Sequence, residues 1–564
     1  MQTTGTKGSD VYDSTGDVRL DLSVKLVRGA DAAEVRRGIR AVTTVSIDDA
    51  YVMAFHTRNV RGGKGERELG IQMLLELYKY DPDITAAILD LLPEYGCWQD
   101  MFALAQAAEK TYSKADKHNI RDLVLRITRD QLLEDMDKPE GESISLCAKW
   151  APREHKMPFM AGALAEKLFP GVHPFSLQMK KYRKLISGLN RRLDTMEIKM
   201  CDGRWAEIVP GKVPGRAGAL YKEALLNQVG SAYKHLGIPS YRKGSLRYPA
   251  DPDRMACREH FMEHYAKAAR GEAVVHGADT LFPHEVVKKV LMMKRSVDEA
   301  DKDHLRAVWR SMVEKARAAG GMGRSIFMSD FSGSMRSSGR NGDIPFLVSM
   351  ALGVLGSEVC TEGFRNRLMT FDSEPQWIEF PEGGDLFDRI RCIDGNKGQG
   401  LSTDFQKAMD LVLATLKEKR VRPGDEPENL IVLTDMAWDQ ACGSQETSVY
   451  TGNRYRHAVK TEGWQTHVEL IREAFKRAGE DMWGAGSGFQ MPRIVIWNLA
   501  AGGRDLHATA DTPGVAMLSG WSPALFKVIQ EAGPRTMTPY EVLRHELDDP
   551  QYDCVRERVR AWFR

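Results

Sequence analysis

The pattern of apolar residues changes near residue 321, and this change limits the chain to a fold of two unlike parts. Before it, apolar residues recur at the spacing of amphipathic helices, as Ile120, Leu123 and Ile127 do. After it, short runs rich in Ile, Val and Leu alternate with amphipathic segments. These runs span 325–330, 367–371, 430–435, 493–500 and 514–520. Buried strands that alternate with helices predict an α/β domain with a doubly wound, mostly parallel sheet of Rossmann-like type.

The helical part predicts an all-α solenoid. Loops with Pro or Gly separate its segments, as expected for antiparallel helix pairs. No repeat of fixed length is visible, so we expect an irregular, HEAT-like solenoid. The predicted units are a polar N-terminal segment, a helical domain, an α/β domain and a C-terminal helical tail, at 1–30, 31–320, 321–535 and 536–564.

Composition narrows the classes of protein that need to be considered. Of the 564 residues, 42% are hydrophobic, which excludes a mainly disordered chain. The net charge of +1 excludes a uniformly basic coat for nucleic acid. The N-terminus lacks the apolar region of a secretory signal, no apolar run is long enough to span a bilayer, and the eight cysteines form no CxxC pair. We therefore expect a cytoplasmic protein with reduced thiols and no membrane contact.

Carboxylates and hydroxyls follow the predicted strands. Asp330, Ser332 and Ser334 come directly after the first strand, Asp435 ends the third, and Thr403 precedes a helix. Ligands of such sheets bind at the carboxyl ends of the strands. Carboxylate and hydroxyl oxygens without Cys or His suit Mg²⁺ or Mn²⁺. The alternative is a polar turn in which Asp or Ser caps the next helix.

Two basic regions of the helical part predict contact with RNA. The string RNVRGGKGER at 58–67 places cations around glycines just before a helix, where backbone N–H groups favour anions. The alternative is a tight turn whose arginines pair with acidic neighbours such as Glu66. Between 180 and 260, 17 Lys or Arg stand against 8 Asp or Glu, interleaved with aromatics, which is typical of a single-strand surface. Alternatively, these aromatics are core and the cations a solvated face. The predicted RNA-binding residues are Arg58, Arg61, Lys64, Arg67, Lys149, Arg153, Lys180, Lys181, Arg183, Arg191 and Arg192.

The segment 321–535 resembles a von Willebrand factor A (vWA) domain that carries a metal-ion-dependent adhesion site (MIDAS). Asp330, Ser332 and Ser334 match the first motif of that family, Thr403 the second and Asp435 the third. The resemblance implies that these five residues bind Mg²⁺ or Mn²⁺, and that the ion recognises a carboxylate of a partner protein.

The strings RGGKGER, EYGCWQD, SLCAKWAP, KMCDGRW and TDMAWDQA, together with this domain, resemble an uncharacterised family of plants, fungi, bacteria and viruses. More distantly, the layout is similar to the Ro ribonucleoproteins, or TROVE-module proteins, which pair helical repeats with a vWA domain. That similarity implies a scaffold for small noncoding or misfolded RNA, with an acidic protein partner at the metal site.

We expect a binding protein and not an enzyme. No GxSxG elbow is present, the His284 segment lacks the second histidine of a zincin helix, and no nucleophile stands beside a base. The alternative to the RNA scaffold is a metal-dependent protein adaptor or a structural assembly component that binds no RNA.

Overall fold

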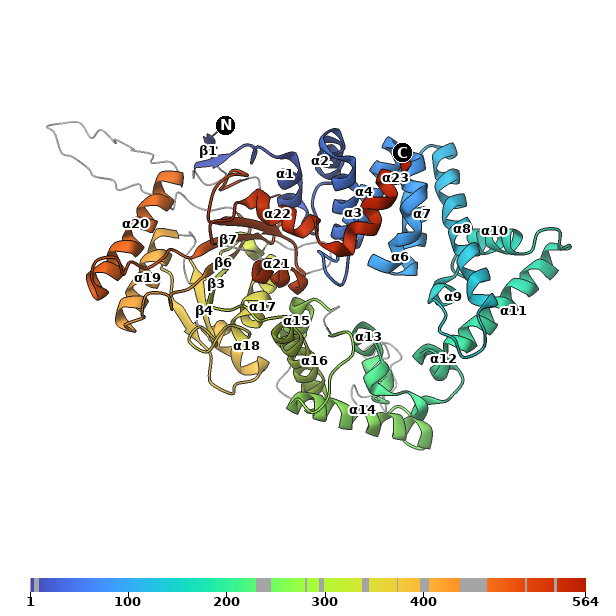
Figure 1. The fold of residues 1–564 in the computed structure, drawn as a ribbon. Coiled ribbons are helices and arrows are strands. Elements are labelled where there is room, and N and C mark those ends of the chain that lie inside the picture. Colours follow the sequence, from blue (N-terminus) through green and yellow to red (C-terminus); the bar gives the residue numbers. More distant parts are fainter. Residues whose placement is uncertain are drawn as a thin grey trace, which may run out of the picture.

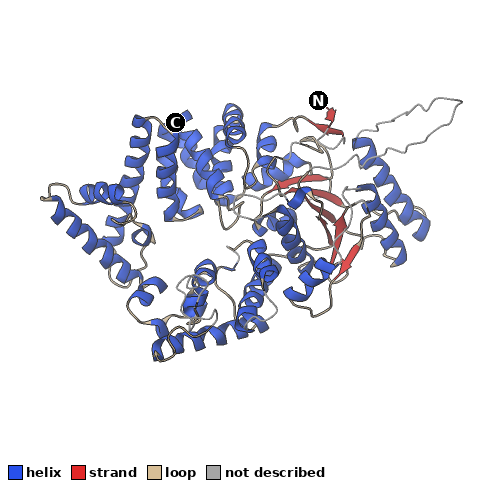
Figure 2. Ribbon diagram, turned by 180° about the vertical axis from the view of Figure 1, so that it is seen from behind, coloured by secondary structure: helices blue, strands red, loops and turns tan. Residues whose placement is uncertain are grey.

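A computed structural model shows a helical half and an α/β half that contact each other (Figure 1). It describes residues 2–4, 10–229, 245–278, 281–293, 299–336, 344–372, 374–395, 405–436, 464–502, 505–531 and 535–563. The strands of the large sheet lie together on one side of the molecule, and helices make up the rest (Figure 2). The seven cysteines in these ranges form no disulfide. None of the helices described is long and apolar enough to cross a membrane.

The helical half begins earlier than the sequence indicated. Residues 18–25, assigned above to a polar segment, form helix α1, with Leu20, Leu22 and Val24 buried. The helices are α1 (Val18–Lys25), α2 (Ala32–Val45), α3 (Ile47–Arg58), α4 (Arg67–Tyr80), α5 (Pro82–Ile88), α6 (Leu92–Tyr95), α7 (Trp98–Thr111), α8 (Lys114–Asp137), α9 (Cys147–Trp150), α10 (Pro158–Leu168), α11 (Phe175–Leu193), α12 (Met196–Cys201), α13 (Gly215–Leu225), α14 (Pro252–Arg270), α15 (Pro283–Met292) and α16 (Glu299–Ala318).

Aspartates mark the start of several of these helices. The carboxylates of Asp17, Asp31, Asp81 and Asp251 accept backbone N–H groups of the following turn. Each bond satisfies donors that a helix start leaves without a partner. The caps stabilise the starts of these helices, whereas the prediction of a helical half came from the periodicity of its apolar residues.

The α/β half is built on a six-stranded sheet in the order β5-β4-β3-β6-β7-β8. Its strands are β3 (Ser325–Asp330), β4 (Arg367–Phe371), β5 (Trp377–Glu379), β6 (Asn429–Thr434), β7 (Arg493–Asn498) and β8 (Val515–Ser519). All neighbours are parallel except β4 and β5. The five predicted runs match β3, β4, β6, β7 and β8, so the α/β prediction is confirmed. The edge strand β5 was missed because three residues carry too little pattern.

Helices cover both faces of the sheet. Alternate side chains such as Phe327 and Ile431 pack with α17 (Pro345–Glu358), α18 (Leu386–Gly395) and α21 (Phe526–Glu531). Their neighbours Met328 and Val432 point the other way, toward α19 (Phe405–Glu418) and α20 (Trp464–Trp483). Strands buried on both faces explain the continuous apolar runs in the sequence.

The helical half contacts the α/β half at both of its ends. Helix α1 packs on β8, and α15 packs on α17. The last two helices, α22 (Pro539–Leu547) and α23 (Asp553–Trp562), return from the sheet to the N-terminal helices, where α23 packs on α3 and α5. The chain therefore follows a closed circuit (Figure 1), a point on which the sequence was silent. A small antiparallel pair, β1 (Gln2–Thr4) and β2 (Asp10–Tyr12), lies at the N-terminus.

Candidate functional site

The first polar cluster lies at the carboxyl end of β3. Asp330 is fully buried, and its two oxygens accept hydrogen bonds from the backbone N–H of Ser332 at 2.9 Å and the hydroxyl of Thr434 at 3.0 Å. The hydroxyl oxygens of Ser332 and the exposed Ser334 are 3.0 Å apart. The structure thus brings these three predicted residues together.

Asp435 lies beside this cluster because β6 is the direct neighbour of β3. Burial, followed by the negative charge of Asp435, raises the pKa of Asp330 to about 7. Two buried carboxylates that repel each other favour a cation between them. Their oxygens and the serine hydroxyls have the chemistry that Mg²⁺ prefers, so the residues present fit a divalent ion. Thr403, the fifth predicted ligand, lies outside the described residues.

Three further residues shape this edge, Thr434, Met436 and His507, and the sequence analysis assigned none of them to the site. The Thr434 hydroxyl also accepts the N–H of Met436, a residue with a φ of 64°. The Met436 carbonyl accepts a hydrogen bond at 2.9 Å from Nε2 of His507, whose pKa burial lowers to about 4. His507 is distant in sequence, so no local signal could have found it. Among the described residues, no three His, Cys, Asp or Glu side chains converge as a metal cluster.

The basic string at 58–67 is largely interior. Lys64 is 1% exposed, and its Nζ donates to Oγ and O of Ser519 and to the carbonyl of Ser23. Burial lowers its pKa to about 8. Arg58 is 4% exposed and pairs with the buried Asp100 at 2.6 Å. Lys64 and Arg58 are therefore buried and bonded within the protein, and neither presents its charge at the surface.

The other two arginines of the string, Arg67 and Arg61, also bind partners within the protein. Arg67 is half-buried and also pairs with Asp100, at 2.6 Å. Arg61 is exposed and donates to the carbonyl of Glu94. The cations of the string thus bind partners within the protein, as the alternative interpretation has it, but the arginines pair with the distant Asp100 and a backbone carbonyl and not with the acidic neighbour Glu66.

Helix α11 is the basic element that faces solvent. It contains six Lys or Arg and no Asp or Glu. Five of these cations are exposed: Lys180, Lys181, Arg183, Lys184 and Arg191. Of these, Arg183 pairs with Glu154 at 2.8 Å, and Lys181 lies over the ring of Phe169. Within the described part of the chain, Lys180, Lys184 and Arg191 form no ion pair.

The remaining predicted cations have internal partners. Lys149 pairs with Glu197 at 2.9 Å, and the half-buried Arg153 donates to a backbone carbonyl. Arg192 donates to the carbonyls of Asp135, Pro139 and Glu142. Lys149 and Arg192 connect separate helical segments, whereas the bond of Arg153 to the carbonyl of Ala148 is local.

The aromatics between 180 and 260 differ in their exposure: Tyr248 is 41% exposed, whereas Tyr182 is buried. Tyr182 is 2% exposed and donates its hydroxyl to the carbonyl of Pro152, so it is core. Phe159 and Phe175, by contrast, are 64% and 59% exposed. Phe175 begins α11, and Phe159 lies in the first turn of α10. Neither stands out in the sequence because each sits in an ordinary helical segment.

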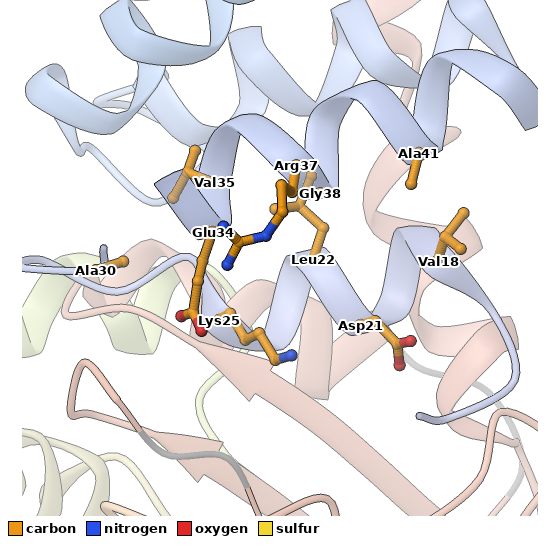
Figure 3. A pocket seen from close by; sticks show the side chains of 10 residues that line it. All are labelled: Val18, Asp21, Leu22, Lys25, Ala30, Glu34, Val35, Arg37, Gly38 and Ala41. Carbon is orange, nitrogen blue, oxygen red and sulfur yellow. The ribbon is translucent and has the colours of Figure 1, made fainter. Parts of the chain in front are cut away.

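A cavity of about 270 Å³ lies between α1 and α2 (Figure 3). Apolar side chains such as Leu22 and Val35 line it, together with the charged side chains of Lys25, Glu34 and Arg37. It contains none of the predicted site residues.

The fold and these sites define a class: a helical half with a basic outer helix, joined to an α/β domain whose sheet carries carboxylates and hydroxyls at its carboxyl edge. Residues 324–558 match a family described as a domain of unknown function (DUF7788). That match includes α22 and the first part of α23, which lie beyond the boundary at 535 predicted above.

Two proteins are similar over nearly the whole chain. The uncharacterized protein L728 of Acanthamoeba polyphaga mimivirus is 25% identical over 562 residues, which cover 96% of this chain and 86% of L728. The crystal structure of the Deinococcus radiodurans RO (RSR) protein has a TM-score of 0.41 and 12% sequence identity, and covers 91% of this chain and 99% of that one.

Proposed function

We propose that this chain is a non-enzymatic RNA-binding scaffold of ribonucleoprotein type, in which the exposed face of α11 contacts the RNA backbone. The observation that carries the proposal is the unpaired charge of Lys180, Lys184 and Arg191 on a helix that contains no acidic residue. Residues three and four apart share one helix face, so these cations form a stripe. Such a stripe attracts phosphates and releases their counterions.

The exposed rings near this stripe support single-stranded RNA in particular. Phe175 begins α11, and its ring lies against Gly162 of α10, one turn after Phe159. Aromatic rings at a basic surface stack on unpaired bases of any sequence. These rings favour an RNA with unpaired segments, and the resemblance to the Ro ribonucleoproteins implies that this RNA is small and noncoding or misfolded.

The test is binding of a fluorescently labelled single-stranded RNA by the full chain at several salt concentrations. The variant Lys180→Glu/Lys184→Glu/Arg191→Glu should bind about 100-fold more weakly, because three phosphate contacts become repulsions. The matched control, Lys417→Glu/Lys419→Glu, reverses two exposed charges on α19 and the turn that follows it, and should bind as the wild type does. Equal binding by the triple variant and the wild type would refute the proposal.

A second function is favoured by the facing carboxylates of Asp330 and Asp435. We propose a vWA-type site in which Asp330, Ser332, Ser334 and Asp435 hold Mg²⁺ or Mn²⁺, with Thr403 added by the sequence resemblance. The bound ion would supply an open position for a carboxylate of an acidic protein partner. The buried Asp330, with its raised pKa, is the group that a divalent cation would relieve most.

Calorimetric titration with Mn²⁺ and with Mg²⁺ tests this site. The wild type should bind one ion, and Asp330→Asn should not. The control Asp481→Asn changes an exposed aspartate of the same domain and should bind normally. If a poly-glutamate peptide binds only with metal while no RNA binds, the chain is a metal-dependent adaptor. A large assembly formed without RNA or metal, measured by light scattering, would instead indicate a structural component.

A further inference from the structure

Residues 59–66 contact segments from four distant parts of the chain. We propose that this loop is an intramolecular clasp that joins both ends of the helical half to the α/β half, so that the closed circuit opens only as one unit. The proposal is independent of RNA and metal binding, because its central residue, Lys64, is only 1% exposed.

Lys64 forms the centre of the clasp. Its ammonium group has three donor protons, and three acceptors lie around Nζ: Ser519 Oγ at 2.6 Å, Ser519 O at 2.9 Å and Ser23 O at 3.1 Å. Ser519 ends β8 and Ser23 belongs to α1. The Ser519 hydroxyl itself donates to the Ser23 carbonyl at 2.5 Å. All donors of Lys64 are therefore used to connect the first helix to the last strand of the sheet.

The far end of the helical half reaches the same place. Arg28 pairs with Glu66 at 3.1 Å, and its guanidinium lies 4.5 Å from the ring centre of Trp521 and 4.8 Å from that of Phe282. Phe282 caps α15, the helix that returns from the far side of the circuit, and Trp521 follows β8. A Cβ on Gly65 would lie 3.3 Å from the Phe282 ring. The Arg28 guanidinium, at the start of the helical half, thus contacts both the end of that half and the α/β half.

The C-terminal helices close the remaining side. The Asn59 side chain donates to Gln551 Oε1 at 2.6 Å and to the Tyr552 hydroxyl at 3.1 Å. A Cβ on Gly62 would come within 2.7 Å of Gln551, and one on Gly63 within 2.1 Å of a backbone carbonyl of α3. The glycines of the string are explained by this close packing rather than by an approaching phosphate.

These contacts make the docking of the two halves cooperative. Lys64 finds acceptors only when α1 and β8 are both in place, and an undocked Lys64 would need water instead. Arg28 similarly loses the ring of Phe282 if α15 moves away, and the ring of Trp521 if the sheet does. Loosening one partner should therefore loosen the others.

Hydrogen exchange of the full chain, followed by mass spectrometry, tests the clasp. Lys64→Met keeps the length of the side chain and removes its donors. We expect exchange about tenfold faster in α1, β8 and the first turn of α15 together. The control Arg61→Met removes an exposed cation of the same string and should leave all three segments unchanged. Faster exchange confined to residues 59–66, or no change, would overturn the proposal.

Milder variants keep the proposal testable if Lys64→Met does not fold. Ser519→Ala removes one acceptor of Lys64 and leaves both carbonyls, and Arg28→Gln removes the cation between the two rings. Each variant should increase the rate of hydrogen exchange in α1, β8 and α15 by a similar factor. If Ser519→Ala affects β8 alone and Arg28→Gln affects α1 alone, the three segments are not joined by a common clasp.

Discussion

Two segments of the helical half are rich in cations, but one is largely buried and the other faces solvent. The string at 58–67 has four cations around three glycines, and three of the four are wholly or partly withdrawn from solvent. Helix α11 has six cations, five of which are exposed. The difference arises from what surrounds them: glycines let backbone and acidic groups approach the first segment, while α11 lacks acidic residues altogether. A basic composition alone therefore does not identify a ligand surface.

The largest difference between the two segments should be in stability. Arg58→Met leaves the fully buried Asp100 with only one of its two arginine partners. Breaking a buried ion pair costs about 3–5 kcal/mol of unfolding free energy. Arg191→Met on α11 should change it by less than about 0.5 kcal/mol. Urea unfolding measures both, and similar losses in the two variants would contradict the assignment of interior and surface.

Lys64 should make the stability depend on alkaline pH. Burial lowers its pKa from 10.5 to about 8. Between these values the unfolded chain holds a proton that the folded protein has released, so the contribution of Lys64 to stability rises with pH. The unfolding free energy of the wild type relative to Lys64→Met should grow by about 2–3 kcal/mol from pH 7.5 to pH 10. A difference that stays constant over this range would show that Lys64 is not desolvated.

Loss of an exposed ring on α11 should weaken RNA binding. Phe175→Ala removes a stacking surface worth about 1–3 kcal/mol per base, so single-stranded RNA should bind about 5–100-fold more weakly. Duplex RNA, whose bases are already stacked, should bind equally well. Phe563→Ala, which changes another exposed aromatic, serves as the control. Equal effects on duplex and single strand would argue against stacking, and circular dichroism melting would check that the helix remains folded.

The smallest effect should be in the salt dependence of RNA affinity. Lys184→Met removes one phosphate contact, which should reduce the slope of log affinity against log salt by about 0.7. Arg61→Met should leave the slope unchanged, because its guanidinium is directed to a backbone carbonyl. A reduced slope for Arg61→Met and not for Lys184→Met would indicate that the string at 58–67, and not α11, binds the RNA.

Local patterns predicted most elements of the fold. Apolar runs of five to eight residues coincide with β3, β4, β6, β7 and β8, because strands buried on both faces carry no polar alternation. Helix α1 was missed because residues 18–25 include three charged residues among the three apolar ones that pack inward. Long-range docking, not local propensity, stabilises this helix.

The candidate metal edge could be predicted in part. Asp330 and Asp435 end strands, and the carboxyl ends of adjacent parallel strands meet at one edge, so spacing alone brought them together. The contributions of Thr434 and His507 depend on which strand neighbours which and on a turn that is distant in sequence. Strand order is a property of the sheet, and no single segment of the chain encodes it.

The sequence by itself determined the two-part architecture and the positions of the strand-end carboxylates, since both follow from local periodicity and from the direction of parallel strands. Only the tertiary structure decided which cations face solvent. The burial of a lysine depends on partners such as Ser23 and Ser519, which lie 41 and 455 residues away from Lys64. Hydrogen bonds and ion pairs that compensate a buried charge form only when the chain closes, so their location is a consequence of the fold rather than of the string that carries the charge.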